Sequence, residues 1–399
     1  MSISNGSVLA AHILGVLHDA GHPAYLVGGC VRDLLLDRPA KDFDVATSAR
    51  PDELLRLFPE ADCVGAHFGV VLVKDGASGA TVEVATFRSD HAYRDGRRPE
   101  SVSFETDPRQ DALRRDFTIN AMMMDPRSGA VLDFAGGRAD LEAKLIRAVG
   151  DPLARFEEDH LRMLRGVRLA ARLGFAIEPG TFAAIQALAP RIQSISAERV
   201  RDELARILTE GGARRGAELL ADSGLQRAIL PEVVMGRAIR AMLDAMREPS
   251  LPLALAVLLH DAPRAAAILE RLRFSHEDAA RACSLVDTQR RFTELRTMSL
   301  SALKRFLRME HFDERLELLR IRLEATGRDP GEYEFACARL AAFSPEELWP
   351  PRLLTGDDLI AQGRAPGPEF GRLLEAVETE QLEGRITTRD AALQFAAAW

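Results

Sequence analysis

Two short stretches decide the fold predicted for this chain: residues 28–33 read GGCVRD, and residues 42–44 read DFD. The glycine pair, Gly28 and Gly29, stands between a predicted strand and a predicted helix. Backbone N–H groups at such a turn can approach a polyphosphate closely, because glycine has no side chain. Arg32, on the first helical turn, can add charge-assisted hydrogen bonds to the same anion. We therefore expect a phosphate-binding turn in a domain that mixes strands and helices.

Asp42 and Asp44 form the second feature, because residues two apart on a strand point to the same side. The strand predicted over residues 42–46 thus presents two carboxylates together and turns Phe43 into the core. Two carboxylates repel each other unless a hard cation lies between them, and Mg²⁺ prefers oxygen ligands and bridges phosphate oxygens. The combination predicts a nucleotidyl-transfer site. Glu83, on a neighbouring predicted strand, is either a third carboxylate, for a second metal ion or for the proton of the attacking hydroxyl, or a solvent-facing side chain.

The organisation of the chain changes near residue 150. Strand and helix patterns alternate before it, whereas the rest reads as helix after helix, which predicts an α+β protein with a small mixed-sheet domain and an all-helical region. The elements predicted in the first part are helices over residues 7–20, 31–36 and 51–58 and strands over residues 24–27, 42–46, 69–73 and 81–87, the last two as a hairpin. The helices predicted in the second part lie near residues 157–173, 181–188, 197–209, 213–222, 236–246, 251–260, 264–272 and 276–297.

One segment of the first part lacks such a pattern. Residues 88–111 are polar and contain DGRRP at residues 95–99. This is too long for an ordinary connection, so we expect a mobile or functional segment. Residues 113–124 are predicted as a helix or the entry to one.

Composition excludes several classes of protein. The 399 residues are enough for about two to three domains. The 52 Lys and Arg against 60 Asp and Glu give a net charge of −8, so an RNA partner needs a local basic surface. The four cysteines form no CxxC pair, which argues against a disulfide framework or a zinc knuckle and fits the reducing cytosol. We find no secretion signal and no apolar run of about 20 residues.

The glycine turn is the first of several stretches that resemble a known family. Residues 28–36, GGCVRDLLL, with the DFD stretch, resemble the head domain of class II tRNA nucleotidyltransferases and bacterial poly(A) polymerases, members of the polymerase β-like superfamily. Residues 113–122, LRRDFTINAM, look like the second motif of this family. The resemblance implies that Arg115, Asp116 and Asn120 contact the triphosphate and the ribose. Taken alone, an Arg-Arg-Asp run at a helix entry is also compatible with a capping cluster.

A helix with one ionic half carries the third feature. Its sequence EDHLRMLRGVR places five charged side chains on that half, opposite an apolar face: Glu158, Asp159, Arg162, Arg165 and Arg168. A solvated helix with ion pairs is one interpretation. The stretch also resembles the family's EDxxR motif, which implies that Asp159 and Arg162 read the Watson–Crick edge of the incoming base. On that resemblance Glu158 belongs to the nucleotide site, and Arg165 and Arg168 lie toward the triphosphate or the base.

The resemblance implies three regions: a nucleotidyltransferase head (residues 1–150), a helical neck that recognises the base (151–225), and a body and tail that bind tRNA (226–399). Residues 195–204, ISAERVRDEL, match a further motif, to which we assign a role in stabilising the neck. The implied activity is template-independent addition of CCA to the 3′ end of tRNA from CTP and ATP. It is two-metal nucleotidyl transfer with Mg²⁺ on Asp42 and Asp44, and it releases pyrophosphate. We expect tRNA as the partner and the cytoplasm as the location.

Other activities share this type of head. A poly(A) polymerase is disfavoured because residues 64–71 contain no Arg or Lys and the C-terminus is acidic. Addition of CC alone is disfavoured because the loop at residues 95–99 looks intact. Addition of A alone stays open. The alternative from another class is a catalytically silent tRNA-binding protein on this scaffold.

Overall fold

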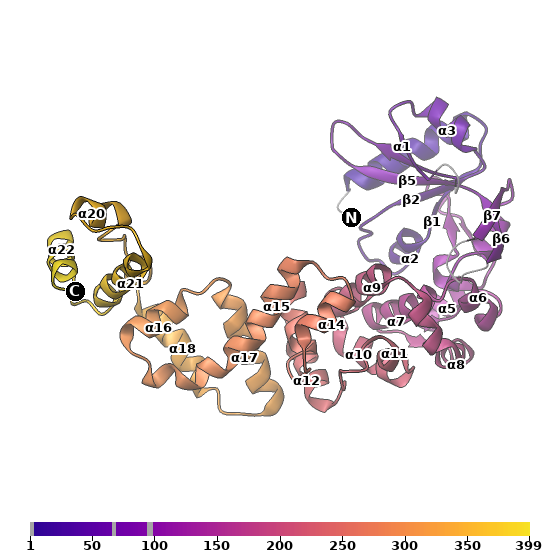
Figure 1. Ribbon diagram of the computed structural model, residues 1–399. Helices are drawn as coiled ribbons and strands as arrows, with labels where there is room; N and C mark the ends of the chain where they lie inside the picture. The colour runs from indigo at the N-terminus through magenta and orange to yellow at the C-terminus, as the bar shows by residue number, and fades with distance from the viewer. Residues whose placement is uncertain (1–3, 66–68, 94–98) are drawn as a thin grey trace. The chain divides into compact units, whose positions relative to one another are not determined.

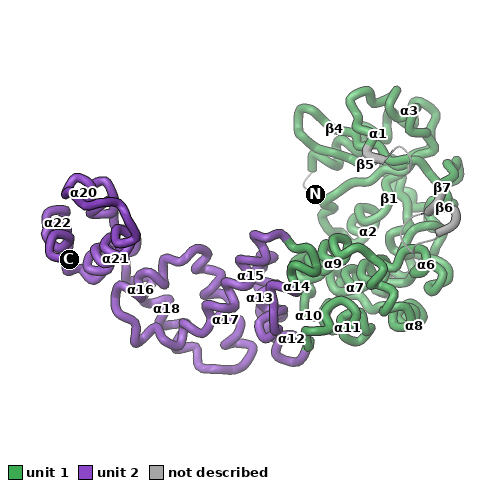
Figure 2. The backbone as a smooth tube through the Cα atoms, viewed as in Figure 1, with its two compact units in different colours: residues 1–235, 268–274 green, residues 236–267, 275–399 purple. Residues whose placement is uncertain are grey.

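The computed structural model describes residues 4–65, 69–93 and 99–399. It divides the chain into two compact units, coloured separately in Figure 2. Each unit consists of two segments, Met1–Met235 with Ile268–Phe274 in the first and Gly236–Ala267 with Ser275–Trp399 in the second. The first unit combines a mixed sheet with helices and the second is helical, so the predicted α+β class is confirmed.

A seven-stranded sheet is the framework of the first unit, with strand order β3-β4-β5-β2-β1-β8-β9. Its strands are β1 (Ala24–Val27), β2 (Asp44–Thr47), β3 (Asp62–Gly65), β4 (Val70–Lys74), β5 (Thr81–Thr86), β8 (Met123–Met124) and β9 (Val131–Leu132). Strands β2 and β5 run parallel, and the other neighbours run antiparallel. Strands β4 and β5 form the predicted hairpin, whereas the pattern did not predict β3.

Short helices accompany this sheet (Figure 1). They are α1 (Asn5–Asp19), α2 (Gly29–Leu35), α3 (Pro51–Leu57), α4 (Pro108–Leu113), the 3-10 helix η2 (Thr118–Asn120) and α5 (Gly137–Glu142). Helix α1 buries Leu9, Ile13 and Leu17, spaced by one turn, and packs against β1, β2 and β5. Helix α1 thereby covers apolar side chains of the sheet. The glycine turn follows the last residue of β1.

The strand that carries the aspartates is shorter than predicted. Strand β2 begins at Asp44, and Asp42 precedes it. Asp44 pairs with Val27, the last residue of β1, and the chain then turns away at Gly28. Strand β1 therefore has no further residue to pair with Asp42. Phe43 is buried, as predicted.

Residues 88–111 contain regular elements that the sequence did not predict. They contain an antiparallel hairpin of β6 (Arg88–Tyr93) and β7 (Pro99–Phe104), followed by α4. The hairpin pairs polar residues, such as Ser89 with Ser103, so it lacks the apolar alternation by which a strand is predicted. Residues 95–98 of the predicted functional loop, and residues 66–68 of the segment used to disfavour a poly(A) polymerase, lie outside the described residues.

The helix predicted over residues 113–124 is wrong. Helix α4 ends at Leu113, and the chain continues through η2 into β8. Phe117 instead forms a β-bridge with Ala148, a contact between segments far apart in sequence. A local pattern cannot predict such a partner.

The helical part of the first unit follows the predicted order. Its elements are α6 (Pro152–Glu158), α7 (Leu161–Leu173), α8 (Pro179–Leu188), η3 (Ala189–Ser194), α9 (Ala197–Thr209), α10 (Ala213–Asp222) and α11 (Leu225–Ile229), with a small parallel pair of β10 (Leu145–Ile146) and β11 (Ala176–Ile177). The single helix predicted over residues 157–173 is interrupted, because Asp159 has an extended backbone between α6 and α7. The predicted apolar face of α7, including Met163, Leu164 and Val167, is buried.

The second unit is built from helices that form two apolar clusters, one around Phe292, Phe306 and Phe312 and one around Leu359 and Leu373. Its elements are α12 (Arg237–Ala245), α13 (Leu251–Leu258), the first part of α14 (Ala265–Arg271), α15 (His276–Thr288), η4 (Gln289–Thr297), α16 (Leu300–Leu307), α17 (Phe312–Thr326), α18 (Gly331–Ala342), α19 (Pro345–Leu348), α20 (Gly356–Ala361), α21 (Pro368–Leu382) and α22 (Arg389–Ala398). In the described part of the chain, no helix combines the length and apolar character that crossing a bilayer requires.

Candidate active site

The turn after β1 brings a glycine next to two oppositely charged side chains. Gly28 has a φ of 76°, a left-handed conformation that glycine adopts without strain. A Cβ atom at this position would lie 3.5 Å from Nη1 of Arg115 and 3.6 Å from Oδ2 of Asp44. Gly29 follows as the first residue of α2. The turn at Gly28 therefore lies between an arginine that can bind a phosphate and a carboxylate that can bind a cation.

Asp44 lies in an excess of negative charge. Burial, together with the charges of Glu83 and Asp42, raises the pKa of its carboxyl to about 6 against the opposing effect of Arg115. The parallel register places Asp44 directly opposite Glu83 of β5. Asp42 and Glu83 are both exposed. Asp42 and Glu83 are thus both near enough to act on Asp44.

This carboxylate group fits a divalent cation. A buried carboxyl that resists ionisation because other carboxylates are nearby gains stability when a cation neutralises the repulsion. Within the described residues, no three acidic, histidine or cysteine side chains form a closed metal cage. Mg²⁺ does not require one, because it is usually held by one or two carboxylates together with water and substrate phosphates.

Arg32 is a buried arginine held in a fixed position. Its Nε donates to Oδ1 of Asp33 at 2.8 Å, and its Nη1 donates to Oδ1 of Asn120 at 2.6 Å. Asn120 belongs to η2, so the structure brings together two predicted nucleotide-binding residues that are 88 positions apart. These contacts orient the guanidinium without exposing it broadly to solvent.

Arg115 and Asp116 are neighbours in sequence but have different partners. Arg115 donates to Oδ2 of the fully buried Asp111 at 2.8 Å. Asp116 forms an ion pair with Arg165 of α7 at 2.6 Å. Burial opposes ionisation of Asp116, but the charges of Arg165 and Arg162 outweigh it and hold the pKa of Asp116 at about 2. The Arg-Arg-Asp run, for which a capping cluster was the alternative interpretation, therefore forms an ionic junction between the sheet domain and α7.

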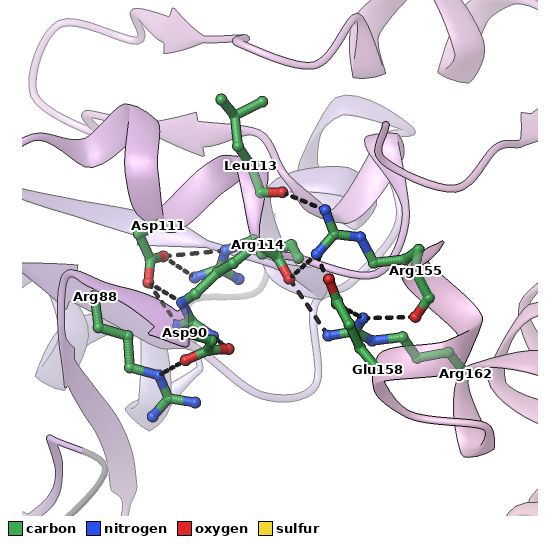
Figure 3. Close-up of polar contacts among 9 residues, drawn as sticks. Arg88, Asp90, Asp111, Leu113, Arg114, Arg155, Glu158 and Arg162 are labelled. Carbon is green, nitrogen blue, oxygen red and sulfur yellow. Dashed lines mark hydrogen bonds and ion pairs between the residues drawn. The ribbon is translucent and has the colours of Figure 1, made fainter. Parts of the chain in front are cut away.

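The predicted base-reading residues have protein partners in this structure. Nη1 of Arg162 donates to the carboxylate of Glu158 and to the backbone oxygen of Arg155 (Figure 3). Asp159 accepts instead from Arg199 of α9, at 2.8 Å. Asp159 and Arg162 are thus close in sequence and bonded to different groups, and the predicted arrangement in one ionic helix face is wrong because the chain leaves the helix at Asp159.

Arg168 is directed toward α9. It is buried, its Nε donates to Glu203 at 2.7 Å, and its Nη1 lies 3.4 Å from Glu210. The contacts described for Arg168 are therefore made within the helical part, unlike those of Arg162 and Arg165.

Two residues that the sequence did not single out belong to this junction, Asp111 and Arg155. Arg199, from the motif predicted to stabilise the neck, also contributes to it. Asp111 stands four residues before Arg115, a spacing that permits an ion pair across a helical turn. The spacing of Arg155 and Glu158 offered the same signal. Arg199 gave no local signal for Asp159, because 40 residues separate them.

Comparison with known proteins agrees with this architecture. A family model described as poly A polymerase head domain matches residues 24–147, and one described as probable RNA and SrmB-binding site of polymerase A matches residues 174–235. Together with the glycine turn and the sheet carboxylates, these matches define the class: a nucleotidyltransferase-type head followed by a helical RNA-binding region. Nucleotidyltransferases of this class typically use divalent metal ions.

Individual relatives narrow the class. The CCA-adding enzyme of Geobacillus thermodenitrificans is 47% identical over 216 residues, 54% of this chain and 53% of that protein. That of Limosilactobacillus fermentum is 43% identical over the same shares. The match spans about half the length of these curated relatives. A crystal structure of the Bacillus stearothermophilus CCA-adding enzyme in complex with CTP covers 99% of both chains at 30% identity, with a TM-score of 0.81. The chain belongs to the family of CCA-adding enzymes.

Proposed function

We propose that this protein adds CCA to the 3′ end of tRNA without a nucleic-acid template, using CTP and ATP. One observation carries the proposal: a Cβ atom at Gly28 would lie 3.5 Å from Nη1 of Arg115 and 3.6 Å from Oδ2 of Asp44, so this turn brings a guanidinium and a carboxylate together. A nucleoside triphosphate requires both groups at this point: a positively charged side chain that binds its phosphates, and carboxylates beside it that can hold a metal ion.

In this proposal Asp42 and Asp44 hold Mg²⁺. When bound, the ion supplies charge neutralisation at the α-phosphate and lowers the pKa of the attacking hydroxyl. Arg32 and Arg115 bind the phosphates, and the buried contacts of Arg32 to Asp33 and Asn120 orient it before the nucleotide arrives. The 3′-hydroxyl of tRNA attacks the α-phosphorus, a new P–O bond forms, and the bond to pyrophosphate breaks. Glu83 lies opposite Asp44 and is the group proposed to accept the hydroxyl proton.

Base selection is assigned to the start of α7. Asp159 and Arg162 offer a carboxylate acceptor and a planar, five-donor guanidinium, which match the donor and acceptor edge of cytosine or adenine. Glu158 holds Arg162, and Arg199 holds Asp159. Arg165 and Asp116 connect this end to the head, whereas Arg168 stabilises α7 against α9. The relative of 30% identity whose structure contains CTP supports this assignment of substrate.

The proposal assigns residues 1–150 to a head, 151–225 to a neck and 226–399 to a body and tail that bind tRNA. The match of residues 174–235 to an RNA-binding model supports RNA contact in the neck. Recognition of tRNA by shape, through phosphates and 2′-hydroxyls, suits a protein that acts on every tRNA. The cytoplasm is the proposed location, since the four cysteines are free thiols.

The decisive experiment incubates the protein with Mg²⁺ and tRNAs that lack all of CCA, its last two nucleotides or only its last nucleotide. Each is supplied with CTP alone, ATP alone or both, and product lengths are read on a gel. When both CTP and ATP are supplied, complete CCA on every tRNA is the expected result. Addition of only A or only C when both nucleotides are supplied identifies a partial enzyme. Long A tails identify a poly(A) polymerase. A protein that binds tRNA and extends none of them contradicts the proposal.

A further inference from the structure

Arg155 of α6 lies where three segments meet, and none of the predicted roles uses it. Its Nη2 donates to the backbone oxygen of Leu113 at 2.9 Å and its Nη1 to that of Arg114 at 3.1 Å. Its Nε donates to the backbone oxygen of Val149 at 3.2 Å, and Nη1 also donates to Glu158 at 3.0 Å. Figure 3 shows the guanidinium between the two carbonyls and Glu158. One planar group thus binds three carbonyls and a carboxylate.

Two of these carbonyls, those of Leu113 and Arg114, directly precede the proposed phosphate-binding residue Arg115. Leu113 ends α4, and carbonyls at a helix end have no partner within the helix. Arg155 supplies that partner directly before Arg115 and Asp116. Val149 belongs to the same assembly, because its N–H donates to the backbone oxygen of Asp116 at 3.1 Å. The segment that carries Arg115 and Asp116 is therefore bound to the guanidinium directly before Arg115, and indirectly, through Val149, at Asp116.

The fourth partner of Arg155 is Glu158, which also holds the proposed base-reading residue Arg162. The carboxylate of Glu158 accepts from both Arg155 and Arg162. Arg162 also lies 3.4 Å from the backbone oxygen of Arg114, so the two arginines share two acceptors. A shift of Arg155 would change the position of Arg162 relative to Arg115.

We propose that Arg155 is a positioning residue for nucleotide selection: it sets the distance between the phosphate-binding segment and the base-reading residues. The inference rests on the proposed function, because it assigns those two ends to one nucleotide. Arg155 acts through Arg162 and the carbonyls of Leu113 and Arg114. Its five donors in a rigid plane span these acceptors, whereas a lysine ammonium has its three donors at a single point.

The test compares the parent with Arg155→Lys, which retains the charge and loses the fork. A displacement of the order of 1 Å at such a site lowers turnover by up to about a hundredfold, so we expect the preference for CTP over UTP to fall about tenfold or more. Inhibition by inorganic triphosphate, which occupies the phosphate end alone, should stay within about twofold of the parent, because Arg32 keeps its contacts to Asp33 and Asn120 and Arg115 keeps its ion pair with Asp111.

Arg56→Lys is the matched control. Arg56 of α3 also binds a carboxylate and a backbone oxygen, both of Asp52. It should retain the parent preference. Circular dichroism and thermal unfolding of all three proteins establish that each is folded.

Three outcomes overturn the inference: a folded Arg155→Lys protein with unchanged preference for CTP, an equal loss for CTP and for inorganic triphosphate, or a protein that does not fold. The last would make Arg155 a requirement of the fold itself. Failure of the proposed function is seen separately, as a parent protein that adds no nucleotide to tRNA. Calorimetric binding of CTP, UTP and inorganic triphosphate then provides the same comparison without turnover.

Discussion

Two groups of acidic residues in the first unit have opposite electrostatic environments. Asp44 lies beside Asp42 and Glu83, and burial with these charges raises its pKa to about 6. At the junction with α7, burial also opposes ionisation of Asp116, but Arg165 and Arg162 outweigh it and its pKa is about 2. Both are aspartates with little exposure to solvent. What differs is whether the protein itself supplies the compensating positive charge.

This difference in charge balance distinguishes a site that can bind a cation from a group of ion pairs that stabilises the fold. A carboxylate group whose charges are unbalanced is stabilised by a cation from outside. A group whose charges are balanced by arginines stabilises the folded chain and needs no ligand. Asp111 belongs to the second kind, since burial of its carboxyl is outweighed by Arg115 and Arg114, which lower its pKa.

The largest expected effect is the loss of nucleotide addition in Asp44→Asn. Removing one metal-binding carboxylate should lower the rate by about a thousandfold, because it removes several kcal/mol of transition-state stabilisation. Primer extension on tRNA measures the rate. Asp52→Asn, at an exposed ion pair with Arg56, is the control and should retain parent activity. Near-parent turnover in folded Asp44→Asn would remove Asp44 from the metal site.

The next effect concerns the balanced group. Asp111 is fully buried and pairs with Arg114 and Arg115, whose side chains are 19% and 17% exposed. Asp111→Asn removes the negative charge that pairs with both guanidinium groups and leaves those groups partly buried. We therefore expect a loss of about 3 kcal/mol in the free energy of unfolding. Urea unfolding measures it. A change as small as that expected for Asp52→Asn, within about 0.5 kcal/mol, would show that the arginines are compensated elsewhere.

The two groups should respond to pH with opposite signs in protein freed of metal by EDTA. The folded pKa of Asp44 lies above its ordinary value of 3.8, so the folded state holds the proton more tightly and stability falls as pH rises from about 4 to about 6. Asp44→Asn should therefore be more stable than the parent by roughly 1–2 kcal/mol above about pH 6 and equal to it near pH 4.

For Asp116 the folded pKa lies below 3.8, so its contribution is present above about pH 4 and is lost as pH falls toward 2. Asp116→Asn should be less stable than the parent by up to ~2 kcal/mol at neutral pH, with a gap that narrows in acid. Urea midpoints across the pH range test both variants. Curves that shift in the same direction for the two variants would refute the comparison.

The smallest expected effect is stabilisation by the metal alone. At about tenfold excess over its dissociation constant, Mg²⁺ adds ~1.4 kcal/mol to the free energy of unfolding of the parent. Asp44→Asn should gain none of this. A thermal-shift assay measures it, with NaCl at equal ionic strength as the control. Equal gains in both proteins would mean that Mg²⁺ binds elsewhere.

Much of the architecture was predictable because it follows from local patterns. The glycine turn, the β4–β5 hairpin and the apolar face of α7 each depend on residues close in sequence. The hairpin of β6 and β7 was missed because its polar pairs show no apolar alternation. The interruption at Asp159 was missed because the residues on both sides continue a helical pattern.

The candidate site shows the same division. The residue types were predictable: carboxylates beside a glycine turn, and arginines before and within a helix. The partner of Asp159 was not, because it is Arg199, 40 residues away. Arg155 was overlooked for the same reason, since two of its carbonyl partners lie 41 and 42 residues before it.

The sequence by itself determined the chemistry available to this protein, because charge, hydrogen-bonding capacity and backbone freedom belong to each residue. It also determined which helix faces are apolar, because that depends on a period of 3.6 residues. The tertiary structure alone decided which carboxylates carry an excess of negative charge and which are neutralised by arginines. That choice depends on distances across the fold, and it separates Asp44, with its raised pKa, from Asp116, with its lowered one.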